Sequence, residues 1–198
     1  MRLRSFLLAA PLSLGMLPGI LLAAPASAEV VTSDPSQFVQ TLSDEAFQTL
    51  RSGNQAAART KFRTLLQQYF AIDEIGDRLI RRWKPTITPA QYAAYKAALP
   101  GYIIGSYADN LYSYANAKLT VVRAQNSGAS AAVLTHVTKP GGQPITAIWT
   151  VTNSGSGYKI SNLTVGGINL AVTQSADFDS YVQRNGFDKL VAFMKSRA

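Results

Sequence analysis

The stretch GYKISNLTVGGINLAVTQSADF, residues 157–178, carries the clearest structural signal in the chain. Its apolar residues fall in two alternating pairs, Tyr158 with Ile160 and Leu163 with Val165, which is typical of a half-buried β-strand. The pair Gly166-Gly167 then allows a sharp bend at the end of a sheet, and we expect helical sequence only from about Ala176. Because the stretch holds no cysteine or histidine, it predicts a sheet wall without catalytic side chains.

Three similar strands precede this stretch. Period-two apolar patterns start at Ala117 and are interrupted by short turns rich in Gly, Asn, Ser and Pro. These turns are Asn126-Ser127-Gly128, Pro140-Gly141-Gly142 and Ser154-Gly155-Ser156-Gly157. Short turns of this composition connect antiparallel neighbours, so we expect a four-stranded antiparallel meander.

The first half of the chain has the period of helices. Apolar residues spaced three and four apart predict helices over about 35–52, 55–69, 73–82 and 89–115. Ser33-Asp34-Pro35 and Thr88-Pro89-Ala90-Gln91 are start signals, because a capping side chain precedes a proline suited to the first turn. Pro100 lies inside the longest helix, where we expect a kink or a short break. Helices followed by strands predict an α+β domain with helices packed on one face of a curved antiparallel sheet.

The N-terminus has the composition of an export signal. Arg2 and Arg4 precede an apolar run, and Ala26-Ser27-Ala28 offers the small residues that a signal peptidase recognises. We therefore predict a signal peptide over residues 1–28, cleaved after Ala28, and a single domain over residues 29–198. Loss of the two arginines lowers the formal net charge from +8 to about +6. A basic exported domain favours lipid headgroups or acidic proteins over nucleic acid as partners.

Composition also restricts the chemistry. The chain has no cysteine and one histidine, which excludes zinc–thiolate sites, thiol catalysis and histidine-based metal clusters. His136 lies in mid-strand, where an ordinary sheet residue is favoured over a general base. Asp73, Glu74 and Asp77 could hold a cation, but a solvated helix face fits better because no nearby loop supplies further oxygen ligands. We therefore predict neither a catalytic nor a metal-binding residue.

Aromatic residues are more informative. Six of the nine tyrosines lie in the predicted helix over residues 89–115, which is apolar over a wide arc. Such a helix can belong to a solid core or line a cavity between helices and sheet, and composition leaves both open.

Several motifs resemble those of a known family. They are Lys61-Phe62-Arg63, Leu65-Leu66, Tyr69-Phe70, Arg82-Trp83, Thr88-Pro89-x-Gln91, Tyr107-x-x-x-Leu111-x-x-Tyr114, Pro140-Gly141-Gly142 and Arg184-Asn185-Gly186 with Leu190. The most telling are Tyr158-Lys159-Ile160 and Val165-Gly166-Gly167-Ile168-Asn169-Leu170, followed by Thr173-Gln174 and Phe178. On these residues the chain resembles the MlaC family of periplasmic phospholipid-shuttle proteins, also called the toluene-tolerance auxiliary family. Tyr158, Asn162 and Ser175 depart from its usual tryptophan, aspartate and arginine.

The resemblance implies a cone-shaped, NTF2-like fold that encloses an apolar pocket for the acyl tails of a phospholipid. It implies a monomeric carrier without enzymatic activity, whose bound phospholipid is cargo and not a cofactor. The family shuttles lipid between an outer-membrane lipoprotein complex and an inner-membrane ABC transporter with a lipid-binding domain, which maintains lipid asymmetry of the outer membrane. A hopanoid-associated branch of the same family is an alternative.

We expect lipid contacts from both halves of the domain. From the helices, the predicted lipid-binding residues are Phe62, Leu65, Leu66, Tyr69, Leu79, Tyr95, Leu99, Ile103, Tyr107 and Leu111. From the sheet, they are Val133, Ile148, Val151, Ile160, Leu163, Val165, Ile168 and Leu170.

Two other hypotheses stay open. An acid–base enzyme on the same scaffold would need a buried acid and a partner donor, and Asp109 with Tyr107 or Tyr112 is the candidate pair. A periplasmic scaffold or adaptor without a ligand would instead have a filled core and no cavity.

Overall fold

The computed structural model describes residues 29–198, apart from the side chains of residues 108–110. The predicted signal peptide lies outside these residues. Four helices come first: α1 (Pro35–Arg51), α2 (Gln55–Tyr69), α3 (Ile72–Leu79) and α4 (Pro89–Tyr112). Five strands follow: β1 (Lys118–Ser127), β2 (Ser130–Thr138), β3 (Ile145–Asn153), β4 (Tyr158–Val165) and β5 (Ile168–Asn169). The last elements are α5 (Leu170–Asn185) and α6 (Phe187–Ser196), which confirms the predicted α+β class.

Side-chain caps fix where the early helices begin. The Asp34 carboxylate accepts a hydrogen bond from the backbone N–H of Gln37 at 2.8 Å, directly before α1. At the start of α4, the backbone N–H of Thr88 donates to Gln91 Oε1 at 2.9 Å, and the N–H of Gln91 donates to Thr88 Oγ1 at 3.2 Å. This reciprocal pair is the predicted capping box, and it satisfies two N–H groups that a helix start leaves unpaired.

Helix α4 continues through Pro100, so of the predicted kink or short break the structure does not contain the break. Leu99 and Tyr102, on either side of Pro100, are both buried in one cluster of side chains. This packing offsets the single backbone hydrogen bond that proline removes.

The sheet is antiparallel throughout, in the order β1-β2-β3-β4-β5. Two irregularities shift its register: Val122 is an extra residue in β1, and Ser161 is an extra residue in β4. Because of the second bulge, Ile160 and Leu163 lie on the same face although their numbers differ in parity.

The stretch 157–178 differs from its prediction after Val165. Gly166 and Gly167 have φ angles of +56° and +85°, which suit a two-residue hairpin turn. The chain reverses there into β5, and α5 begins at Leu170 instead of about Ala176. Asn169 starts this helix by accepting a hydrogen bond on Oδ1 from the N–H of Val172 at 3.1 Å.

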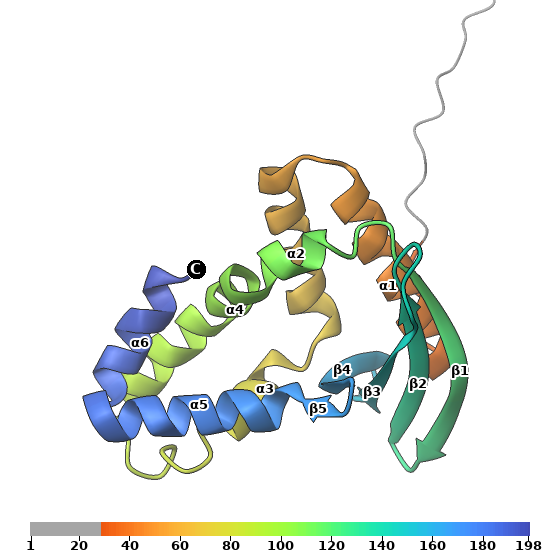
Figure 1. The fold of residues 1–198 in the computed structure, drawn as a ribbon. Helices are drawn as coiled ribbons and strands as arrows, with labels where there is room; N and C mark the ends of the chain where they lie inside the picture. Colours follow the sequence, from red (N-terminus) through yellow and green to blue (C-terminus); the bar gives the residue numbers. More distant parts are fainter. Residues whose placement is uncertain (1–28) are drawn as a thin grey trace, which may run out of the picture.

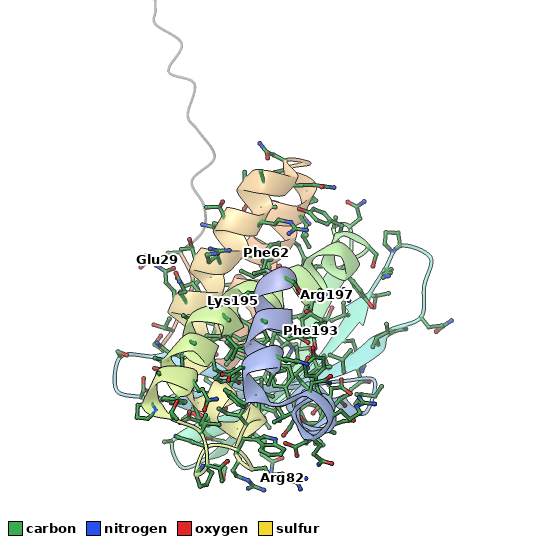
Figure 2. The ribbon with its side chains drawn as sticks, turned by 90° about the vertical axis from the view of Figure 1, so that its left-hand side faces the viewer. Glu29, Phe62, Arg82, Phe193, Lys195 and Arg197 are labelled. Atoms are coloured by element: carbon green, nitrogen blue, oxygen red, sulfur yellow. The ribbon has the colours of Figure 1, made fainter. Side chains whose placement is uncertain are left out.

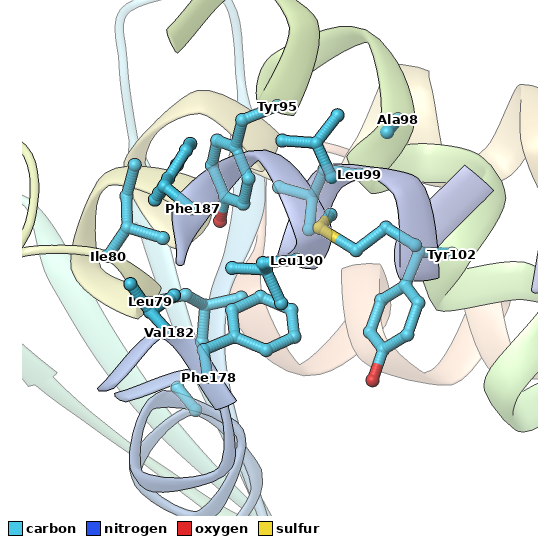
Figure 3. Close-up of a cluster of buried hydrophobic side chains, with 13 residues drawn as sticks. Leu79, Ile80, Tyr95, Ala98, Leu99, Tyr102, Phe178, Val182, Phe187 and Leu190 are labelled. Carbon is cyan, nitrogen blue, oxygen red and sulfur yellow. The ribbon is translucent and has the colours of Figure 1, made fainter. Parts of the chain in front are cut away.

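Buried side chains form two main clusters. The helical cluster contains residues of α3, α4, α5 and α6, and Figure 3 shows Tyr95, Leu99, Phe187 and Leu190 in its interior. The sheet cluster joins α1 and α2 to one face of the sheet, which we call the inner face. One half-buried tryptophan packs against each cluster. Trp83 packs on the helical cluster. Trp149 packs on the sheet cluster.

Helix α2 connects the two clusters through a small third cluster of Leu66 and Ile104, whose neighbours Ile72 and Ile103 also pack on the helical cluster. Leu65 is buried in the sheet cluster, whereas its neighbour Leu66 packs with Ile104 of α4. Figure 1 shows that α4 and α5 come together at α6 and diverge toward the sheet. The helical layer therefore touches the sheet through α1, α2, α3 and α5, while α4 packs on α2, α3 and α6.

Candidate functional site

The structure divides the predicted lipid-binding residues by burial. One group is fully packed inside the protein: Leu65, Leu66, Leu79, Tyr95, Leu99, Val133, Val151 and Ile160. A second group is half-buried: Phe62, Tyr69, Ile103, Tyr107, Leu163, Val165 and Leu170. Leu111, Ile148 and Ile168 are 38%, 39% and 58% exposed. Since packed side chains have no free surface for a ligand, the candidate site consists of less buried residues.

Three residues of α4 illustrate the trend. Ile103, Tyr107 and Leu111 are spaced four apart, so they follow one side of the helix. Exposure rises along α4, from Tyr102 at 7% through the half-buried Tyr107 to Leu111 at 38%. This increase runs in the direction in which α4 and α5 diverge (Figure 1). Inward-facing apolar surface that no neighbouring helix covers is typical of a ligand site.

The inner face of the sheet contributes further half-buried apolar residues. Leu163 pairs with Trp149 and Val165 pairs with Ala147, and paired residues of an antiparallel sheet share a face. Because Trp149 packs on the sheet cluster, Leu163 and Val165 also lie on the inner face. Both are half-buried.

We define the inner wall as six incompletely buried apolar residues of α4, α5 and the inner face of the sheet. It comprises Ile103, Tyr107 and Leu111 of α4, Leu163 and Val165 of β4, and Leu170 of α5. Ile168 of β5 pairs with Val165 and extends the wall to the surface.

One hydrogen bond joins α4 to α5 at the inner wall. The hydroxyl of Tyr107 donates to Gln174 Oε1 at 3.3 Å. Burial raises the pKa of Tyr107, with smaller contributions from Tyr102 and from the charge of Asp177. The phenol therefore stays protonated at neutral pH and remains a hydrogen-bond donor.

Ile148 does not belong to the inner face. It pairs with Leu134 on one side and Thr164 on the other, whereas Val133 and Val151 occupy the alternate positions that face the helices. Successive residues of a strand point to opposite faces, so its predicted place on the pocket side was wrong. Ile148 is instead part of the outer, solvent-facing surface of the sheet.

The candidate acid–base pairs have other roles or are not described. The side chain of Asp109 lies outside the described residues. Tyr107 is bound to Gln174, and the hydroxyl of Tyr112 donates to the backbone carbonyl of Gln55 at 3.3 Å. His136 is exposed and pairs with Thr120 and Thr146 on the outer face of the sheet.

Asp73, Glu74 and Asp77 form ion pairs with basic side chains. Their partners are Lys96, Arg78 and Lys84 in turn, at 2.7, 2.7 and 2.5 Å. Within residues 29–198, no group of three His, Cys, Asp or Glu side chains is placed to hold a metal ion. In the same range, no helix combines the length and the apolar character needed to cross a bilayer.

Two surface hollows lie away from the inner wall. One, of about 280 Å³, lies between α2, α4 and α6 and is lined by Arg63, Gln67, Ala97, Ala98, Pro100, Gly101, Lys195 and Ala198. The other, of about 310 Å³, lies between α1 and α2 and is lined by Glu45, Gln48, Thr49, Ser52, Ala57, Ala58 and Lys61. Both contain charged or amide side chains, which suit polar ligands better than acyl tails.

Basic side chains lie toward the end of α6, and within residues 29–198 no ion pair is found for Lys195 or Arg197. Figure 2 looks onto this helix, where Lys195 and Arg197 lie near its C-terminal end. The Arg197 guanidinium lies 5.4 Å from the centre of the Phe193 ring. Helix α2, which lies beside α6 at the hollow of Arg63 and Lys195, contains basic residues and no acidic one.

The sequence did not predict Gln174, Phe70 or Ile72 as residues at or beside the inner wall. Gln174 reaches Tyr107 because α5 begins at Leu170, which places residues 170, 174 and 178 on one side of that helix. Phe70 and Ile72 pack beside Leu66 and Ile104. The available signal was the sequence Asn169-Leu170-Ala171-Val172, which can cap and begin a helix as well as continue a strand.

The fold and the inner wall are those of an α+β domain with incompletely covered apolar surface between helices and sheet. Residues 38–196 match the family described as MlaC protein, and the chain belongs to this family. A solved structure with the same fold is the phospholipid-binding protein from Ralstonia solanacearum in complex with a phospholipid. It is 22% identical, with a TM-score of 0.69 over 83% of this chain and 97% of that one.

Proposed function

We propose that this protein is a periplasmic lipid carrier that binds the acyl tails of a phospholipid against the inner wall. Inward-facing apolar residues that stay half-buried carry this proposal, since a domain with a filled core would cover them. Membership of the MlaC family supports it, as does the likeness to a protein solved with a phospholipid. As a carrier the protein forms and breaks no covalent bond.

The energy of acyl tails in water explains why a carrier needs such a wall. Two tails hold roughly 30 methylenes, and exposing each to water costs about 0.8 kcal/mol, or on the order of 25 kcal/mol together. A protein that moves them between membranes must keep most of this surface dry. Aliphatic and aromatic side chains that carry no charge at neutral pH, as on the inner wall, fulfil that requirement.

The test is native mass spectrometry of the protein purified from cells, together with lipid extraction. We expect about one phospholipid per chain, and delipidated protein should recover it from vesicles. Protein that carries no lipid and takes up none from vesicles would contradict the proposal.

Paired substitutions locate the site. Leu163 and Ile148 are apolar residues of neighbouring strands on opposite faces of one sheet. Leu163→Gln should reduce bound phospholipid several-fold, because an amide in a tail site is desolvated without a partner. Ile148→Gln is the matched control and should retain wild-type loading. Equal loading of both variants would place the lipid elsewhere.

We further propose the complete route: export by the segment 1–28, and transfer between an outer-membrane lipoprotein complex and an inner-membrane ABC transporter. The basic surface of the folded domain fits acidic partners or headgroups. Loaded protein should deliver fluorescent phospholipid faster to proteoliposomes that contain the transporter than to empty vesicles of the same composition. Equal rates for both would argue against a dedicated transporter partner.

A further inference from the structure

A polar pair of side chains interrupts the apolar inner wall. Tyr107 and Gln174 meet between α4 and α5, one helical turn nearer the sheet than the packed rings of Tyr102 and Phe178, whose centres are 5.4 Å apart. One turn further on, Leu111 and Leu170 are the next residues on the same sides of the two helices. The pair therefore lies where the filled core ends and the uncovered wall begins.

Hydrogen bonding leaves Gln174 with unused donors. Its amide oxygen accepts the proton of Tyr107, so the amide nitrogen keeps both of its N–H bonds. Among the described residues this nitrogen has no hydrogen-bond partner, although Gln174 is half-buried. A donor beside apolar side chains is best satisfied by a neutral acceptor on whatever occupies the wall.

The charge nearby limits which acceptor fits. Asp177 stands one turn further along α5 and its charge acts on Tyr107. A carboxylate or phosphate oxygen beside this pair would meet a like charge. The carbonyl oxygen of an ester is neutral, accepts hydrogen bonds, and in a glycerolipid joins directly to the acyl tail.

We propose that the amide of Gln174, oriented by Tyr107, donates a hydrogen bond to an ester carbonyl of the bound glycerolipid. The inference rests on the proposed function, since it assigns one contact within that lipid site. Tyr107 acts as a positioning residue: its hydroxyl fixes the amide oxygen and so directs the N–H bonds. The site then distinguishes acyl esters from lipids that lack the carbonyl.

Ester-linked and ether-linked phosphatidylcholine test this, because with equal tails they share headgroup, charge and chain length and differ in the carbonyls. Each lipid competes with a fluorescent phospholipid for delipidated protein. We expect wild type to bind the ester lipid about three- to tenfold more tightly, the range of one hydrogen bond to a neutral acceptor.

Variants assign the preference to the pair. Gln174→Met keeps the side-chain length but removes the donors, so its two affinities should be nearly equal. Tyr107→Phe should lower the preference toward that value. Gln183→Met, an exposed position of the same helix, is the matched control and should retain the wild-type ratio.

The outcomes separate this inference from the carrier function. Equal affinities of wild type for both lipids, or an unchanged preference in Gln174→Met, would overturn the ester contact while leaving lipid binding in place. If neither lipid binds to wild type, the proposed function itself fails.

Discussion

At the scale of single residues, Asp77 shows how a few polar contacts hold α3 against α4. Its Oδ1 accepts from the hydroxyl of Tyr92 at 2.6 Å, and its Oδ2 lies 2.5 Å from Lys84 Nζ. Burial alone would raise the pKa of Asp77. Hydrogen bonds from Lys84 and Tyr92, with the charges of Lys84 and Lys96, outweigh burial and hold that pKa below its ordinary value of 3.8.

A lowered pKa makes the contribution of Asp77 depend on pH. Its stabilising effect is complete above the unfolded-state pKa and is lost as pH falls through the lower, folded-state pKa. We expect Asp77→Asn to be less stable than wild type at pH 7, with the difference shrinking toward zero as pH drops below about 4. Urea unfolding from pH 7 to pH 2 measures this, with Asp44→Asn as the control. A difference that stays constant with pH would contradict it.

At the scale of elements, predictions succeeded where a cap is local and failed where two patterns overlap. Asp34 and Thr88 sit next to prolines, so the starts of α1 and α4 follow from adjacent residues. The start of α5 was misplaced because apolar residues continue in nearly strand-like alternation past Gly167. Whether that run pairs as a strand or forms a helix depends on where β4 ends in the sheet, which is a tertiary property.

The effect of substitutions in the Gly166-Gly167 turn on stability should depend on backbone conformation alone. A Cβ added at Gly166 would meet no heavy atom within 4 Å, so only its φ of +56° restricts the residue. We expect Gly166→Val to lower the free energy of unfolding by about 1–2 kcal/mol. Gly166→Asn should cost less, since asparagine tolerates this region. Chemical denaturation measures both, and equal losses would argue for a steric cause.

Substitution of Gly105 should destabilise the protein for a different reason, because the surroundings of this residue are crowded. A Cβ there would lie 1.5 Å from the backbone carbonyl oxygen of Arg197, beyond the end of α6. We expect Gly105→Ala to destabilise by about 1–3 kcal/mol through overpacking, despite the roughly 1 kcal/mol that alanine gains in a helix. In a chain that ends at Ser196 the same substitution should be neutral or stabilising. Thermal unfolding of the four proteins separates the two effects.

At the scale of the whole molecule, the sequence indicated the lining but not which residues are covered. Leu99 and Tyr107 belong to the same apolar helix, yet one is packed and the other half-buried, because α5 and α6 cover only part of α4. Ile148 was misplaced by one position of strand alternation, which turns a side chain to the opposite face. Such differences depend on packing between distant elements.

The link through α2 should control how the two clusters unfold. Leu66→Ala removes the contact between α2 and Ile104, so we expect a loss of about 2–5 kcal/mol. The difference between sheet and helices in amide protection from hydrogen exchange should then be larger than in wild type. Val182→Ala, buried within the helical cluster, should lower stability without this divergence. Uniform loss of protection in both variants would show that α2 does not couple the clusters.

The placement of the two tryptophans gives the protein a natural optical label on each side. Trp83 donates from Nε1 to Asp179 beside the helical cluster, and Trp149 donates from Nε1 to Thr135 beside the sheet cluster. A Trp83→Phe variant would emit from the sheet side alone, and Trp149→Phe from the helical side alone. Fluorescence during lipid uptake could therefore resolve which side responds first, without attaching any dye to the chain.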